Sequence, residues 1–226
     1  MKAVERRGST LEYLTLLPDD YVPEHRYPMI ICLHGRGADM RDLAGLAPAI
    51  DSGGYVYVCP NAPVTIAIGP GYTGQAWYEP AGNPASSAIE QALTALDGLI
   101  HEVFTEYQIT PGQALLLGFS QGGGMTYRYG ILRPEMFAGL AILSGALRNP
   151  EALLPHLPMA RTQRLFIAHG THDPVLSVDL SQDAVAFLTA QGYQPLYREY
   201  PMGHEITMDV LNDLTPWIHQ TLPPKR

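Results

Sequence analysis

The stretch Ala114-Leu-Leu-Leu-Gly-Phe-Ser-Gln-Gly122 decides the fold of this chain. Its first four residues, Ala114 to Leu117, indicate a short buried strand, and the residues from Gln121 to Leu132 have a helical pattern. The glycines on either side of Ser120 allow a strand and a helix to approach closely while the serine takes a strained backbone conformation. The stretch therefore predicts a strand, a sharp turn and a helix, with the Ser120 hydroxyl lifted clear of a sheet.

Similar apolar runs recur along the chain and predict further strands. The runs are Leu11 to Leu17, Met29 to Leu33, Tyr55 to Cys59, Leu140 to Leu143, Leu165 to Ala168 and Tyr197 to Tyr200. Apolar residues at helical spacing predict helices from Ser86 to Tyr107, from Ser181 to Gln191 and from Glu205 to Leu222. Because runs that are apolar on both faces suit buried parallel strands, the alternation predicts an α/β fold whose mostly parallel sheet carries helices on both faces.

The segment from Asn61 to Pro84 shows little periodicity and is expected to be an unusually long loop. It contains Trp77 and Tyr78, aromatic residues that either cover an edge of the core or form part of a pocket. Loops of this length are more often functional than idle, so the segment is a candidate for contact with a ligand.

The size and composition of the chain restrict its class. Its 226 residues suit one domain covering 1–226, and a hydrophobic fraction of 46% supplies a sizeable core. Lys and Arg number 14 against 22 Asp and Glu, a formal net charge of −8, which argues against nucleic acid or an anionic membrane as a partner. Since the sequence shows neither a long apolar run nor a signal-peptide pattern, the expected location is the cytoplasm.

Polar side chains follow the predicted strands, at the edge where parallel sheets place their sites. Ser120 needs a base, because an unassisted serine hydroxyl is a weak nucleophile. His204 follows the last predicted strand, and Asp173 follows an earlier one. A carboxylate held at a strand end can orient an imidazole, and the chain order Ser, Asp, His suits this architecture. We interpret Ser120, Asp173 and His204 as a candidate catalytic set.

Other residues offer alternatives to these assignments. Asp179 and Asp183 also lie between the serine and the histidine, where they suit a solvated helix face or a helix cap, and Asp173 itself precedes a proline and could be a plain turn residue. The pair His169 and His172 has no further ligand spacing that would complete a zinc site. No metal and no cofactor are therefore expected.

The loop His34-Gly-Arg-Gly-Ala-Asp39 follows the strand that ends at Leu33. Its two glycines let the backbone turn N–H groups toward a developing oxyanion. Each such donor lowers the activation barrier by about 3–4 kcal/mol. The same residues also suit a tight turn into a helix near Arg41 to Ala49, and the two interpretations are compatible.

Five motifs follow one another along the chain: His34-Gly-x-Gly-Ala-Asp39, Ala76-Trp-Tyr78, Gly118-Phe-Ser-Gln-Gly-Gly123, His169-Gly-x-x-Asp173-x-Val175 and Gly203-His204. Taken in this order, they resemble the phospholipase/carboxylesterase family, which includes acyl-protein thioesterases and small bacterial carboxylesterases. The resemblance implies a compact α/β-hydrolase fold with a minimal lid or none, and hydrolysis of carboxylic esters or thioesters. It implies Ser120 as the nucleophile, Asp173 as the acid and His204 as the base.

The resemblance also implies that the backbone amides of Arg36 and Gln121 form an oxyanion hole, and that Trp77 and Tyr78 lie beside the substrate. The family usually has an apolar residue at the position of Arg36, so this chain places a cation near the pocket mouth. We hypothesise that Arg36 favours polar or anionic esters over long acyl chains. The alternative is that Arg36 reaches into solvent or pairs with Asp39.

The sequence thus predicts a serine esterase for small-molecule esters with short to medium acyl chains, because little sequence remains for a deep, lidded tunnel. An acyl thioesterase, acting on acyl-proteins or acyl-CoA, would use the same site. A dienelactone-type hydrolase usually carries cysteine where this chain has Ser120. A non-catalytic relative that binds a small ligand is a further alternative, although such proteins usually lose one of the three site residues. The oligomeric state stays open, although small esterases of this family often form homodimers.

Overall fold

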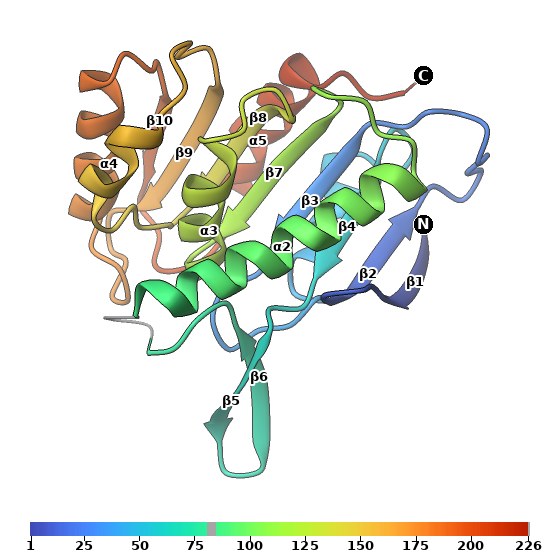
Figure 1. Cartoon of the computed structure of the whole chain (residues 1–226), viewed down its shortest axis with the longest axis horizontal. Helices are drawn as coiled ribbons and strands as arrows, with labels where there is room; N and C mark the ends of the chain where they lie inside the picture. The colour runs from blue at the N-terminus through green and yellow to red at the C-terminus, as the bar shows by residue number, and fades with distance from the viewer. Residues whose placement is uncertain (81–84, 226) are drawn as a thin grey trace.

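The computed structural model describes residues 1–80 and 85–225. Within them, eight strands form one sheet in the order β1-β2-β4-β3-β7-β8-β9-β10 (Figure 1). Their bounds are β1 Lys2–Arg7, β2 Glu12–Leu17, β3 Met29–Leu33, β4 Val56–Pro60, β7 Ala114–Phe119, β8 Phe137–Leu143, β9 Arg164–Gly170 and β10 Leu196–Tyr200. The pairs β1–β2 and β2–β4 are antiparallel, and the pairs from β4 through to β10 are parallel. The predicted mostly parallel sheet is confirmed.

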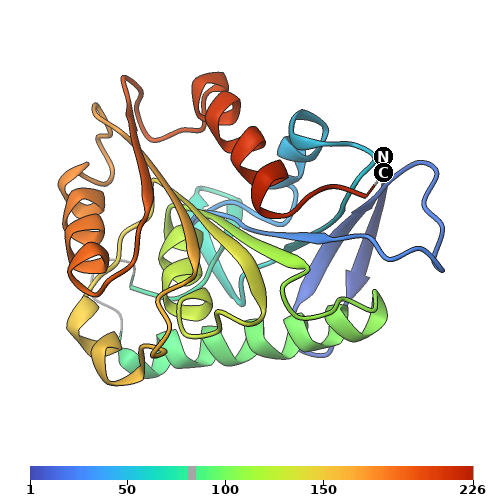
Figure 2. The same ribbon diagram turned by 90° about the horizontal axis from the view of Figure 1, so that it is seen from above.

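Helices cover both faces of this sheet (Figure 2). Their bounds are α1 Ala47–Ile50, α2 Ser86–Glu106, α3 Gln121–Gly130, α4 Asp179–Ala190 and α5 Met208–Thr221, with 3₁₀ turns η1 Leu43–Leu46 and η2 Pro150–His156. Helices α2, α3 and α4 share one apolar cluster with the sheet, and α1 and α5 share the other. Because successive strand residues point to opposite faces, one run such as β3 supplies both clusters, and all five of its residues are buried.

Two parts of the fold differ from what the sequence pattern predicts. Strand β1 was not predicted, because it is an edge strand whose mostly exposed residues carry no apolar signal. The loop expected from Asn61 to Pro84 is wrong over much of its length, since β5 Val64–Gly69 and β6 Tyr72–Ala76 form an antiparallel hairpin that projects from the body (Figure 1). The hairpin is largely exposed, so backbone pairing forms it without a buried face that a sequence pattern would reveal. Residues 81–84 of that segment lie outside the described residues.

The described residues between β4 and α2 contain this hairpin and no helix, in keeping with the minimal lid that the resemblance implies. In residues 1–80 and 85–225, no helix combines the length and the apolar character needed to cross a bilayer.

Candidate active site

Three of the predicted site residues meet at the carboxyl edge of the sheet. Ser120 lies on the turn between β7 and α3, Asp173 follows β9, and His204 follows β10. His204 Nε2 lies 2.9 Å from Ser120 Oγ, and His204 Nδ1 lies 2.6 Å from Asp173 Oδ2. Because the three strands run parallel, residues 84 positions apart in sequence reach the same edge. The structure therefore joins a hydroxyl, an imidazole and a carboxylate in one hydrogen-bonded chain.

The turn holds Ser120 in an uncommon backbone conformation, with φ 55° and ψ −116°. The Ser120 N–H donates to Leu143 O at 2.9 Å, which anchors the turn to strand β8. A Cβ atom at Gly122 would lie 2.0 Å from Leu33 O, so a larger residue would prevent α3 from starting this close to β3. The close approach expected from the glycines is present at this turn.

Both oxygens of the Asp173 carboxylate have hydrogen-bond partners. Oδ1 accepts the N–H groups of Val175 at 2.8 Å and Leu176 at 2.9 Å, while Oδ2 faces His204. Burial raises the pKa of this carboxyl, but the hydrogen bonds, led by that from Leu176, outweigh burial and lower the pKa of Asp173 below its usual value. Asp173 is therefore ionised near neutral pH, which is the form that can orient an imidazole.

His169 is a buried neighbour of Asp173. The sequence suggested no role for it, since its spacing to His172 does not complete a zinc site. Its Nε2 lies 2.8 Å from Leu176 O and 3.3 Å from Asp173 Oδ2, so this nitrogen carries the hydrogen. Its Nδ1 lies 2.6 Å from Ser181 Oγ on α4. The ring thus connects the end of β9, the loop that carries Asp173, and α4. The signal that could have revealed this role is its position at the end of the same strand, four residues before the acid.

The loop from His34 to Asp39 lies against Ser120 and is held by the hairpin. A Cβ atom at Gly35 would lie 3.3 Å from Ser120 Cβ. The Gly37 N–H donates to Gln75 O at 2.7 Å, and the Gln75 N–H donates back to the next loop residue at 2.8 Å. Strand β6 therefore fixes the backbone of this loop beside the serine.

His34 anchors the same loop from the inside. Its Nε2 accepts the Ala62 N–H at 3.0 Å, and its Nδ1 lies 2.7 Å from Gly35 O, so the ring is neutral with its hydrogen on Nδ1. Burial lowers the pKa of His34, which favours this neutral form. The backbone carbonyl of His34 accepts the indole N–H of Trp77 at 2.9 Å.

The amides expected to form the oxyanion hole border the serine on two sides. The Gln121 N–H belongs to the first turn of α3, where no acceptor exists within the helix and the helix dipole favours negative charge. Arg36 follows Gly35 in the loop that touches Ser120, and Arg36 and Gln121 both line the cleft described below.

The Gln121 side chain holds the aromatic pair at the end of β6, a role that the sequence did not suggest. Its Oε1 accepts the Trp77 N–H at 2.8 Å, and its Nε2 donates to Tyr78 O at 2.9 Å. Trp77 is fully buried and lies behind the site, whereas Tyr78 lines the cleft. Of the two aromatic residues expected beside the substrate, only Tyr78 borders the open space.

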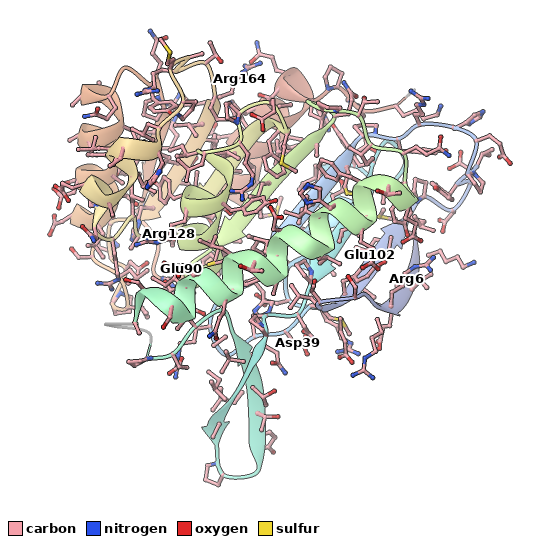
Figure 3. All side chains as sticks on the ribbon, in the orientation of Figure 1. Arg6, Asp39, Glu90, Glu102, Arg128 and Arg164 are labelled. Atoms are coloured by element: carbon pink, nitrogen blue, oxygen red, sulfur yellow. The ribbon has the colours of Figure 1, made fainter. Side chains whose placement is uncertain are left out.

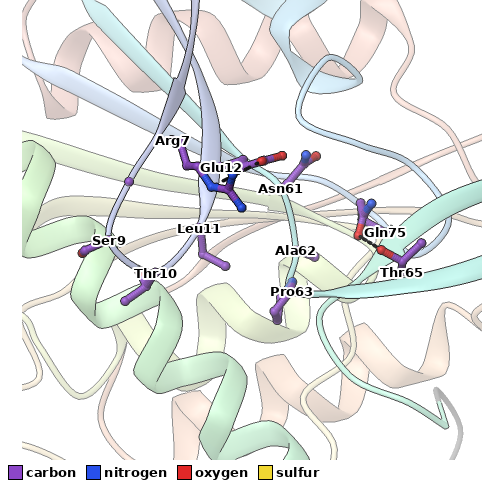
Figure 4. A pocket seen from close by; sticks show the side chains of 11 residues that line it. Arg7, Ser9, Thr10, Leu11, Glu12, Asn61, Ala62, Pro63, Thr65 and Gln75 are labelled. Carbon is purple, nitrogen blue, oxygen red and sulfur yellow. Dashed lines mark hydrogen bonds and ion pairs between the residues drawn. The ribbon is translucent and has the colours of Figure 1, made fainter.

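An open cleft of about 460 Å³ gives access to Ser120 and His204. It is lined by Arg36, Tyr78, Ser120, Gln121, Gly124, Ala146, Arg148, Val175, Leu176 and His204. A second hollow, of about 340 Å³, lies between the β1–β2 turn and the hairpin, and its lining includes Arg7, Glu12 and Gln75 (Figure 4). The first cleft is the candidate active site, because Ser120 and His204 line it and neither lines the second hollow.

Arg36 borders the cleft, but its charge is compensated. Its Nε lies 2.5 Å from Glu79 Oε1, and a second guanidinium nitrogen lies 3.3 Å from Glu79 Oε2. The alternative that Arg36 pairs with Asp39 is wrong, because Asp39 pairs with Arg41 at 3.4 Å. The partner of Arg36 lies 43 positions away, so the folded chain and not the local sequence selects it.

Comparison with known proteins identifies the family and the fold of the chain. A model of the family described as phospholipase/carboxylesterase matches residues 23–222. A probable carboxylesterase from Oryza sativa subsp. japonica is 29% identical over 72% of this chain and 64% of its own length. Acyl-protein thioesterase 1 from Mycosarcoma maydis is 28% identical over 84% of this chain and 90% of its own length. The crystal structure of esterase PE8 superposes with a TM-score of 0.81 at 25% identity, covering 98% of this chain and all of that one.

Proposed function

The chain belongs to the phospholipase/carboxylesterase family of α/β-hydrolases, and from this premise we propose that it hydrolyses carboxylic esters with short to medium acyl chains. The observation that carries the proposal is the hydrogen-bonded chain from Ser120 through His204 to Asp173, open to a cleft. The cleft is open and has a volume of about 460 Å³, which suits a small ester better than a long acyl chain that would need a deep tunnel.

In the proposed mechanism, His204 Nε2 takes the proton of Ser120 while Oγ attacks the ester carbonyl carbon. Asp173 accepts a hydrogen bond from the Nδ1–H of His204. It therefore fixes the tautomer in which Nε2 is free to take a proton, and it stabilises the imidazolium that forms. The backbone N–H groups of Arg36 and Gln121 stabilise the oxyanion of the tetrahedral intermediate. His204 then protonates the leaving alkoxide, and the alcohol departs from the acyl-enzyme.

Water completes the proposed cycle. His204 takes a proton from the water molecule, and the hydroxide attacks the acyl carbon to form a second tetrahedral intermediate. Collapse of this intermediate breaks the bond to Ser120 Oγ, which regains a proton from His204. The product leaves as the carboxylic acid, which loses its proton to solvent water, and the free serine is restored.

A thioesterase is the second candidate, because one relative is named acyl-protein thioesterase 1 and the same steps release a thiol instead of an alcohol. A kinetic panel separates the two candidates. We expect kcat/KM on nitrophenyl esters to be highest at short to medium acyl length and to exceed kcat/KM on the matching acyl-CoA thioesters. A clear optimum at palmitoyl length would contradict the proposed chain length, and higher kcat/KM on thioesters would favour the alternative.

His169→Asn is expected to lower both stability and kcat. The shorter amide cannot reach Leu176 O and Ser181 Oγ together, and each buried polar group left without a partner costs about 1–3 kcal/mol. The Asp173 carboxylate also loses a buried neighbour, so kcat should fall more than KM changes. Urea unfolding and steady-state kinetics measure the two effects.

His172→Asn is the matched control, because His172 is an exposed histidine three residues further along the chain, in the loop after β9. It should leave both the free energy of unfolding and kcat close to those of the wild type. Equal effects of the two substitutions would show that His169 does not position Asp173.

A further inference from the structure

The cleft gathers positive charge in a chain whose formal net charge is −8. Arg36 and Arg148 line it, and Arg128 contacts Arg148 from helix α3. Glu79 compensates Arg36. For Arg128 and Arg148, no carboxylate within residues 1–80 and 85–225 lies within 4.0 Å, so none of these residues forms an ion pair with the charges on this side of the cleft.

Helix α3 begins one residue after the serine and brings Arg128 to the loop that carries Arg148. Gly124 and Arg128 are spaced by four residues and therefore share one face of the helix. A guanidinium nitrogen of Arg128 donates to Arg148 O at 2.6 Å, which joins the end of the helix to the loop after β8 (Figure 3 labels Arg128). Arg128 lies about 10 Å along the helix from Gln121, its first residue, and helical side chains lean back toward the N-terminus.

Tyr78 adds a hydroxyl to the same side of the cleft. This hydroxyl lies beside Gly124, since a Cβ atom there would be 3.7 Å from Tyr78 Oη, an ordinary contact distance. Burial raises the pKa of Tyr78, while the nearby charges of Arg128 and then Arg148 lower it, so both cations act at the position of this hydroxyl. Tyr78 and Arg148 line the cleft, and Arg128 contacts Arg148 from behind; we call Tyr78, Arg128 and Arg148 the cationic corner.

The cationic corner carries an electrostatic cost that an anion would offset. Burial lowers the pKa of Arg128, because its charge is partly removed from water. A partly buried cation without a countercharge is unfavourable, and hydrogen bonds between a guanidinium and a carboxylate or phosphate are among the strongest available. Val175, Leu176 and Ala146 also line the cleft and supply apolar contacts.

We propose that the substrate carries an anionic group, a carboxylate or phosphate, separated by several atoms from the ester carbonyl and bound by the cationic corner. The inference rests on the proposed esterase function and names the substrate class of the same cleft. Half-esters of dicarboxylic acids carry such a group on the acyl side, and esters of hydroxy acids or of phosphorylated alcohols carry it on the alcohol side.

Two ester series test the proposal and distinguish the two sides. The first pairs nitrophenyl adipate and suberate half-esters with their methyl-capped neutral diesters. The second pairs acetyl esters of 4-hydroxybutyrate and of 4-hydroxybutyl phosphate with neutral butyl acetate. We expect kcat/KM of the charged ester to exceed that of its neutral partner in at least one series. The ratio should fall as salt is raised, because ionic strength screens exposed charges.

Arg148→Gln is the decisive variant, because Arg148 is exposed and its loss should be tolerated by the fold. We expect the charged-to-neutral ratio to fall by about 10-fold or more, the range that one charge-assisted hydrogen bond supplies. Arg148→Lys, which keeps the charge, should retain part of the ratio. Arg164→Gln is the matched control, because it removes the same charge at the amino end of β9, away from the cleft, and should leave the ratio unchanged (Figure 3).

Equal kcat/KM for charged and neutral esters in both series would overturn the proposal, as would a ratio that Arg148→Gln does not change. If the wild type hydrolyses neither member of any pair, the esterase function fails separately. Calorimetry with monomethyl adipate then still decides the anion site, because binding should be detectable in the wild type and weaker in Arg148→Gln. Absent binding, or equal binding by the two proteins, would overturn the anion site.

Discussion

Ser120→Ala is expected to lower kcat on a nitrophenyl ester by about 10⁶-fold, the scale seen when a catalytic serine is removed from such a hydrogen-bonded chain. The substitution deletes the atom that the proposed mechanism uses to attack the carbonyl, Oγ at 2.9 Å from His204 Nε2. The remaining pair of His204 and Asp173 then has no nucleophile to activate. Alanine matches serine in size and keeps the φ of 55°, so the turn should remain folded.

Steady-state kinetics and labelling with a fluorophosphonate measure this effect together. The wild type should be modified at Ser120, identified by mass spectrometry of the peptide, and the variant should not. Ser87→Ala is the matched control, because Ser87 is exposed in the first turn of α2. Activity retained by Ser120→Ala, or labelling at another serine, would show that the nucleophile lies elsewhere and would favour a binding protein.

Asp173→Asn is expected to lower kcat by about 10⁴-fold, the loss that follows when the acid of such a set becomes an amide. The direction follows from the contacts of the carboxylate. Since Oδ1 accepts two backbone N–H groups, the amide oxygen of asparagine should take that place and leave its NH₂ facing His204 Nδ1. The imidazole must then accept at Nδ1 and carry its hydrogen on Nε2, so it cannot take the proton of Ser120.

The same substitution should change the dependence of stability on pH. The pKa of Asp173 is lower in the folded protein than in the unfolded chain, so the unfolded chain binds its proton at the higher pH. The stabilising contribution is therefore complete above the unfolded pKa of about 4 and is lost as pH falls through the folded pKa. The amide of the Asp173→Asn variant does not titrate, so the stability difference between the two proteins should shrink as pH falls below about 4.

Urea unfolding at a series of pH values and steady-state kinetics near neutral pH measure both effects of Asp173→Asn. Asp183→Asn is a suitable control, because Asp183 is an exposed aspartate on α4. A kcat within about 10-fold of the wild type would contradict the role given to Asp173, since loss of the correct tautomer costs far more. A stability difference that stays constant from about pH 7 to about pH 2 would contradict the direction of its pKa shift.

Local patterns in the sequence were sufficient for the order of most elements. Buried strands such as β3 and β7 are short apolar runs, and α2 shows its apolar stripe over many turns, so each signal is contained in neighbouring residues. Strand β1 and the hairpin of β5 and β6 lack such a signal because their residues are mostly exposed. Their formation depends on pairing with a partner strand and not on burial.

For the candidate site, the sequence by itself determined which residue types follow which strands. Ser120, Asp173 and His204 each come after an apolar run, and parallel strands carry their ends to one edge, so the convergence of the three could be predicted. The glycines around Ser120 predicted the close turn, because only residues without a side chain let the strand and the helix approach this closely.

Only the tertiary structure decided which side chains pair with one another around these residues. Three such contacts join residues at least 20 positions apart. They are the ion pair of Arg36 with Glu79, the hydrogen bond of Gln121 to the Trp77 N–H, and the hydrogen bond of Arg128 to Arg148 O. A charge or an amide has many candidate partners along a chain, and the hydrogen bond that forms depends on distances of a few ångströms between separate elements. The residue types of the site could therefore be predicted from local sequence, whereas its charge balance, from which we infer an anionic substrate, required the folded chain.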